Sequence, residues 1–89
     1  MVETRRVEYK ASVDGDLRRL DPRAAVRVLN QIEKALSSGA PGGKPLTGEF
    51  TGLFRLRVGD YRVIYARTDE GFLVLRIAPR REIYRKGRP

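Results

Sequence analysis

The stretch Leu53–Ala78, LFRLRVGDYRVIYARTDEGFLVLRIA, holds three apolar segments separated by two short turns. In Leu53–Val58, apolar residues alternate with two arginines, which is the two-residue period of a half-buried strand. Gly59-Asp60 follows, and glycine can take the positive φ that a two-residue hairpin turn needs. Tyr61–Arg67 is apolar on both faces, as is typical of a central strand. The stretch therefore predicts an antiparallel hairpin, with its second strand inside the sheet.

A third strand is predicted over Phe72–Ala78, after a turn at Thr68–Gly71 and before Pro79. Simple alternation along this strand places Arg76 on the face opposite three apolar residues. Those three residues are Leu73, Leu75 and Ile77.

The segment before this stretch predicts one strand and two helices. Glu3–Lys10 alternates moderately and predicts a short strand. Ser12–Leu20 predicts a helix with Ser12 as its N-cap, because serine can accept a bond from the first free amides. Asp21-Pro22 starts a second helix, which ends near Ser37, and the short link predicts an antiparallel helical hairpin. Its expected apolar face consists of Val26, Leu29, Ile32 and Leu36.

Residues 40–51 are rich in glycine and proline, and we expect a loop there. The fold class is then α+β: an N-terminal strand, a helical hairpin and a three-stranded antiparallel meander, forming a small, mainly antiparallel sheet packed on two helices. With 89 residues, the chain is expected to form a single domain over residues 1–89.

Composition limits the chemistry. The sequence has no Cys and no His, which excludes disulfides, thiolate or histidine metal ligands, and Ser-His-Asp triads. The formal charge is +8, and residues 51–89 hold ten basic against four acidic side chains. Such an excess favours an anionic partner, such as nucleic acid. No apolar run has the length of a membrane span, and the first residues lack the apolar core of a signal peptide, so we expect a cytoplasmic protein with no membrane partner.

Arginines on the three strands are the candidate site. If the registers align, one face of the sheet carries Arg55, Arg57, Arg62 and Arg76. The simpler interpretation is a solvated outer face. The functional one is an anion site, because a cluster of guanidiniums repels itself when no anion is bound.

Three segments together resemble the RelE/ParE toxin superfamily, and the RelE branch in particular. They are KPLTGE over Lys44–Glu49, GLFRLRVGDYRVIY over Gly52–Tyr65, and IAPRREIY over Ile77–Tyr84. The resemblance implies the toxin of a type II toxin–antitoxin system with a RelE-like fold. It also implies an mRNA endonuclease that works in the ribosomal A site. This activity uses neither a metal nor a cofactor: the 2′-OH attacks the adjacent phosphate.

The resemblance also assigns residues. The family's catalytic positions fall on Arg55, Arg57, Arg62, Arg80 and Tyr84, with Arg81 as an alternative to Arg80. Further RNA contacts are expected from Arg76, Arg81, Arg85 and Lys86. The second-strand bases are lysines in the best-understood branch. Arg57 stands at one of these positions, and a guanidinium stays protonated above pH ~12, so the general base is left unassigned.

The implied partners are a cognate antitoxin, the ribosome with its RNA, and mRNA; the toxin–antitoxin complex is expected to bind DNA through the antitoxin. Two alternatives stay open. One is a ParE-like inhibitor of DNA gyrase, and the other is a ribosome- or RNA-binding homologue that does not cleave.

Overall fold

The computed structural model describes residues 6–37 and 43–79. These residues form one five-stranded sheet in the order β1-β5-β4-β3-β2, with two α-helices. The elements, in chain order, are β1 (Arg6–Tyr9), α1 (Val13–Arg18), α2 (Pro22–Ser37), β2 (Lys44–Pro45), the 3₁₀ turn η1 (Gly48–Phe50), β3 (Leu53–Val58), β4 (Tyr61–Arg67) and β5 (Gly71–Pro79). The predicted α+β class is confirmed.

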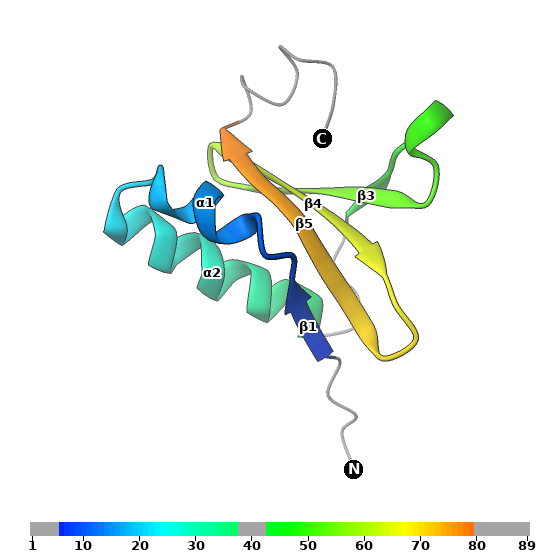
Figure 1. Cartoon of the computed structure of the whole chain (residues 1–89), viewed down its shortest axis with the longest axis horizontal. Helices are drawn as coiled ribbons and strands as arrows, with labels where there is room; N and C mark the ends of the chain where they lie inside the picture. The colour runs from blue at the N-terminus through cyan, green and yellow to red at the C-terminus, as the bar shows by residue number, and fades with distance from the viewer. Residues whose placement is uncertain (1–5, 38–42, 80–89) are drawn as a thin grey trace.

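The two helices form the predicted hairpin, running in opposite directions along the same side of the sheet (Figure 1). Pro22 is the first residue of α2, where its missing N–H costs nothing because the first helical amides have no partner within the helix. Ser12 does lie at the N-cap of α1, but its hydroxyl makes no capping bond. The short α1 is held instead by Asp16, whose carboxylate accepts a 3.0 Å bond from the Ile77 amide of β5.

The predicted apolar face of α2 was partly wrong. The helix buries Ala24, Val28, Ile32 and Leu36. Val26 is 58% exposed, whereas Ile32 is fully buried. At 3.6 residues per turn, Val26 lies about 120° around the helix from Ile32, while Val28 lies only about 40° from it. Two valines two residues apart gave a choice of faces, and packing on the sheet selects Val28.

Sheet pairing follows from the turns. The β3–β4 hairpin closes with Val58 opposite Tyr61. Gly59 has a φ of 58° and the described residues include no non-glycine with positive φ, which is the pattern of a type II′ turn. On its other side, β4 pairs antiparallel with β5, and β1 adds to β5 in parallel. A side chain at Gly71 would collide with the Arg6 backbone, so glycine permits the start of this parallel pair.

Between the helices and the sheet lies the main core, formed by α1, α2 and one side of β3, β4 and β5. Tyr65 is buried at its centre, with its ring 5.3 Å from Phe54 in a stacked arrangement and 5.5 Å from Phe72 edge-on. The helices cover this side only, so the opposite side of the sheet is left for other contacts (Figure 1).

The loop expected over residues 40–51 needs correction. Within it the chain forms β2, which pairs antiparallel with β3, and then η1. β2 has only two residues and ends in proline, which has no amide to donate, so it pairs with only part of the outer edge of β3. Such a short strand leaves no periodic pattern in the sequence.

Candidate nucleic-acid interface

Four arginines project from the side of the sheet that the helices leave uncovered. Arg57 of β3 lies directly opposite Arg62 of β4. Arg55 lies opposite Ile64, which in turn lies opposite Arg76 of β5. Because directly paired residues share a face and every second residue repeats it, all four point to the same side. The predicted alignment of registers is confirmed, and we call Arg55, Arg57, Arg62 and Arg76 the arginine face.

A β-bulge puts Arg76 on this face. Tyr65 pairs with Val74, but the next residue back, Ile64, pairs with Arg76, so Leu75 has no opposite residue. The expectation that Leu73, Leu75 and Ile77 share a face is therefore wrong. Ile77 joins the core under the helices, while Leu75 packs on the other side with Ile64. Without the extra residue, Arg76 would follow Val74 into the core.

Arg62 is the most buried member, with 6% of its surface exposed. It lies between Arg57 on one strand and the small Ala78 on the other. Arginine is rarely this buried, and two like charges directly opposite each other on neighbouring strands destabilise a sheet. The pair therefore concentrates positive potential at one place on the face, and an anion there lowers the repulsion.

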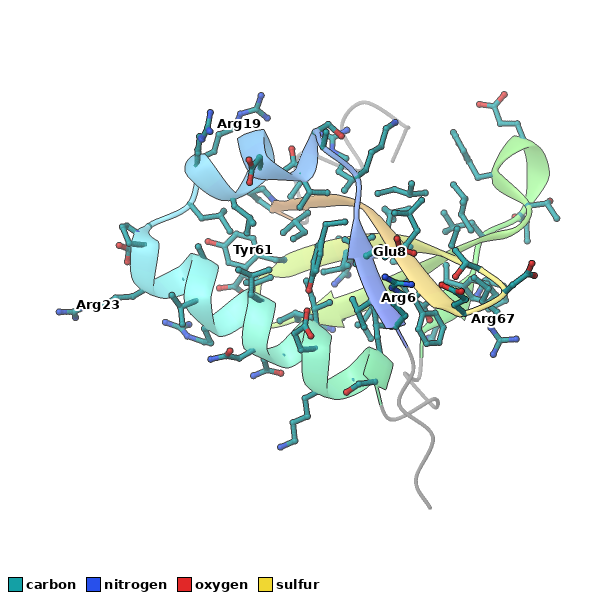
Figure 2. All side chains as sticks on the ribbon, turned by 60° about the horizontal axis from the view of Figure 1, so that its bottom comes forward. Arg6, Glu8, Arg19, Arg23, Tyr61 and Arg67 are labelled. Atoms are coloured by element: carbon teal, nitrogen blue, oxygen red, sulfur yellow. The ribbon has the colours of Figure 1, made fainter. Side chains whose placement is uncertain are left out.

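Acidic residues are scarce on the arginine side. The sequences of β3, β4 and β5 contain no Asp or Glu. Glu8 of β1 shares this side, but it lies beside Leu73, one strand beyond β5 (Figure 2). The face is thus basic because of composition as well as geometry.

Lys44 joins the arginine side and was missed by the sequence analysis. It lies on β2 directly opposite Arg55, so the two side chains share a face, and it is exposed. The signal was weak because Lys44 falls in a glycine- and proline-rich segment. Its position adds a compact ammonium group at the β2 edge of the arginine face.

Three other arginines and Tyr61 lie away from the arginine face. Arg67 covers the Phe54 ring at 5.6 Å on the helix side of the sheet, and Arg6 pairs with Glu70 at 2.8 Å near the β4–β5 turn (Figure 2). Arg23 projects from α2, away from the sheet (Figure 2). Tyr61 lies between the helices and the sheet, where it packs against the core (Figure 2). These residues therefore belong to the surface or the core, and not to the arginine face.

The remaining predicted site residues lie outside the described part of the chain. They are Arg80, Arg81, Tyr84, Arg85 and Lys86. Within residues 6–37 and 43–79, no group of three or more His, Cys, Asp or Glu side chains could hold a metal ion. In the same part of the chain, no helix is both long and apolar enough to span a membrane.

Known proteins are similar to this chain in sequence and in fold. A family model described as "ParE toxin of type II toxin-antitoxin system, parDE" matches residues 7–84. Toxin RelG of Mycobacterium tuberculosis is 35% identical over 83 residues, covering 90% of this chain and 95% of RelG. The chain belongs to the RelE/ParE superfamily of type II toxins.

Solved structures of RelE/ParE proteins are similar to this chain in fold. In the RelBE2 toxin–antitoxin complex of M. tuberculosis, the matching chain superposes with a TM-score of 0.79 at 32% identity, covering 90% of this chain and 95% of that one. In the RelE–RelB complex of Pyrococcus horikoshii, the TM-score is 0.67 at 29% identity, with 86% and 96% covered. This RelE/ParE member therefore has the sheet and helices of RelE toxins.

Proposed function

We propose that this toxin is a ribosome-dependent mRNA endonuclease that cleaves the message in the A site without a metal and thereby stops translation. The observation that supports it is the gathering of Arg55, Arg57, Arg62 and Arg76 on the uncovered side of the sheet. The similarity to proteins named RelG and RelE supports the proposal, because such cleavage is typical of RelE-like toxins.

The proposed reaction is an internal displacement at phosphorus. The 2′-oxygen of one nucleotide forms a bond to the adjacent phosphorus as the bond to the 5′-oxygen breaks. The 2′-OH proton is removed by a base and the 5′-oxygen gains a proton, which leaves a 2′,3′-cyclic phosphate and a 5′-OH end. Negative charge gathers on the phosphoryl oxygens in the transition state, and fixed cations stabilise that charge.

Arg57 and Arg62 are the proposed cradle for this charge, because they lie directly opposite each other and Arg62 is buried. Arg55 is proposed to bind the same phosphate, because it is the neighbour of Arg57 on the same face of β3, two residues away. The guanidiniums act as fixed positive charges and donors, since they do not release a proton near neutral pH.

Roles are also proposed for the C-terminal residues of the family motif. Arg80 is proposed to stabilise the transition state, with Arg81 as the alternative. Tyr84 is proposed to stack on a base or to orient the 2′-OH. Arg76, Arg85 and Lys86 are proposed to contact RNA phosphates.

An antitoxin is the proposed protein partner. RelBE2 and the P. horikoshii protein were both solved as toxin–antitoxin complexes. The formal charge of +8 suits an acidic segment laid over this chain, and such binding weakens with salt. DNA binding by the complex is proposed to occur through the antitoxin.

The test is to incubate the purified protein with translating ribosomes and mRNA, then map the new 5′ ends. Breaks at A-site codons, with cyclic phosphate at the upstream end, are expected only when ribosomes are present. Free mRNA and the Arg80→Ala variant are the controls. Growth arrest with intact mRNA would overturn the nuclease assignment.

A second candidate is inhibition of DNA gyrase, because the matching family model is described as the ParE toxin. Expression in cells separates the two functions: translation stops first if the protein is a nuclease, and DNA replication stops first if it inhibits gyrase. The arginine face favours the nuclease, since binding a protein does not require a phosphate cradle.

The Arg57→Lys variant sharpens the assignment of the base. Lysine can lose its proton when like charges surround it, whereas arginine cannot. If residue 57 can serve as the base, the single-turnover cleavage rate should rise. An unchanged rate would show that residue 57 acts through its charge alone.

A further inference from the structure

A hollow of about 480 Å³ extends from the arginine face toward α1. It opens between the uncovered side of the sheet and the segment that leads from β1 into α1. Arg76 belongs both to the lining of this hollow and to the arginine face. Adjacent strands lie about 4.8 Å apart, so Arg76 is about 10 Å across the sheet from Arg55. The hollow is therefore a neighbour of the proposed phosphate cradle.

The floor of the hollow is apolar. It is formed by Leu53, Ile64 and Leu75, which belong to the small second core on the side away from the helices. Ile64 is 1% exposed, while Leu53 and Leu75 are half-buried and keep part of their surface open. The bulge that carries Arg76 outward also puts Leu75 on this side. Such a floor suits a flat apolar ring better than a small hydrated anion.

The rim of the hollow is cationic. Among the residues that the structure describes, Lys10, Arg19 and Arg76 line it against one carboxylate, that of Asp16. One oxygen of Asp16 accepts the bond from the Ile77 amide at 3.0 Å, and the other lies 3.9 Å from Arg19. The Asp16 side chain is only 13% exposed, whereas that of Arg19 is 70% exposed. The charge that the rim presents to solvent is therefore positive.

We propose that this hollow binds one nucleotide of the message next to the cleaved bond. The base rests on Leu53, Ile64 and Leu75, and its phosphate contacts Lys10 and Arg19. Single-stranded RNA is recognised by such combinations of a surface for the base and cations for the backbone. The inference rests on the proposed function for the identity of the RNA, because Arg76 links the hollow to the arginine face.

The first test uses the full chain alone and does not depend on cleavage. Methyl-labelled protein is titrated with adenosine 5′-monophosphate and followed by NMR, with inorganic phosphate and adenosine as separate probes. The methyl signals of Leu53, Ile64 and Leu75 should shift and saturate with the nucleotide, and not with phosphate. Methyl signals that do not move with the nucleotide would overturn the proposal, as would equal shifts with phosphate alone.

The matched variants remove the same kind of charge inside and outside the hollow. Lys10→Ala combined with Arg19→Ala should weaken nucleotide binding about tenfold, because charge-assisted contacts are lost. Arg18→Ala, on the neighbouring exposed residue of α1 outside the lining, should leave binding unchanged. Equal weakening by both would show general charge attraction and contradict the hollow as a site.

The second test uses translating ribosomes and a library of messages. If the hollow holds a message nucleotide, the Lys10→Ala/Arg19→Ala variant should change the ranking of cleaved codons, while Arg18→Ala should not. A uniform drop across all codons would indicate contact with ribosomal RNA and overturn the proposal. If the wild-type protein cleaves no message, the proposed function fails, and the NMR titration alone decides whether the hollow binds a nucleotide.

Discussion

The two sides of the sheet are built by the same strands, yet one side is the main apolar core and the other combines the arginine face with a small apolar cluster. On the helix side, Val63, Tyr65 and Val74 are each at most 1% exposed and pack against α1 and α2. On the other side, alternate positions of the same strands carry the arginine face. Burial of apolar surface on one side stabilises the fold, whereas like charges on the other side oppose it. Neighbouring residues of the same strand therefore serve different roles, one in stability and the next in the proposed activity.

The bulge at Leu75 shows how closely the two sides depend on each other. One inserted residue in β5 moves Arg76 out of the core and Ile77 into it. The helix side of β5 therefore stays apolar at Ile77, and the other side carries Arg76. Single substitutions on each side of the sheet test whether the helix side determines stability and the arginine side does not.

The largest effect on stability is expected from the helix side. Ile32→Ala removes a fully buried side chain of α2, and the cavity and lost burial should lower the free energy of unfolding by about 2–5 kcal/mol. Val26→Ala on the same helix is the control, because Val26 is 58% exposed and its loss should cost about 0.5 kcal/mol or less. Urea unfolding measures both values. Similar losses for the two variants would show that α2 packs through a different face.

Asp16 fastens α1 to the edge of the sheet, and its loss should have the next largest effect. Asp16→Ala leaves the amide of the buried Ile77 without its 3.0 Å acceptor, which should cost about 1–3 kcal/mol. Asp14→Ala removes the same charge from the same helix, where Asp14 lies 3.9 Å from the exposed Arg18, so little change is expected. Equal thermal midpoints for the two variants would contradict the fastening role.

Tyr9 joins β1 to α2 through a hydrogen bond from its hydroxyl to the Glu33 carboxylate. Tyr9→Phe should cost about 1 kcal/mol at neutral pH. Burial, and then Glu33, raise the pKa of Tyr9 above its usual 10.0, so the folded state keeps the proton that the unfolded state loses. Stability should therefore be complete below pH 10 and fall as the pH rises above it. Unfolding curves at increasing pH should show a shallower decline for Tyr9→Phe than for the wild type; a parallel decline would count against this contact.

The smallest effect is expected at the exposed end of β1. Arg6 and Glu70 form a 2.8 Å pair, but their side chains are 64% and 67% exposed. Solvent and salt screen such pairs, so Arg6→Ala should leave the thermal midpoint unchanged within error. A clear fall in the midpoint at 0.15 M salt would show that the parallel β1–β5 pair depends on this charge contact.

Local patterns predicted much of the fold. The strand over Leu53–Val58 has the expected bounds, because the alternation over Phe54–Val58 and the glycine turn both fix its register. Tyr61–Arg67 is central, as its apolar residues on both faces indicated. The same registers put Arg55, Arg57 and Arg62 on one face, as predicted. Arg76 was predicted there by simple alternation, whereas it reaches this face through the bulge.

Features that depend on tertiary packing could not be predicted. Leu73, Leu75 and Ile77 are all apolar, so the sequence hides the change of phase at the bulge. The choice between Val26 and Val28 was decided by the sheet beneath α2. Lys44 became part of the basic surface only through its pairing with Arg55, and two residues give no periodic signal.

If the arginine face serves activity and not the fold, Arg57→Ala should separate the two. The unfolding free energy and the ribosome-dependent cleavage rate should be measured on the same preparation, with Arg23→Ala as the control for charge. Because Arg57 is exposed, we expect unchanged stability, within about 0.5 kcal/mol, and cleavage at least about 100-fold slower. Arg23→Ala should change neither value. A folded Arg57→Ala protein that cleaves at the wild-type rate would show that Arg57 takes no part in the reaction.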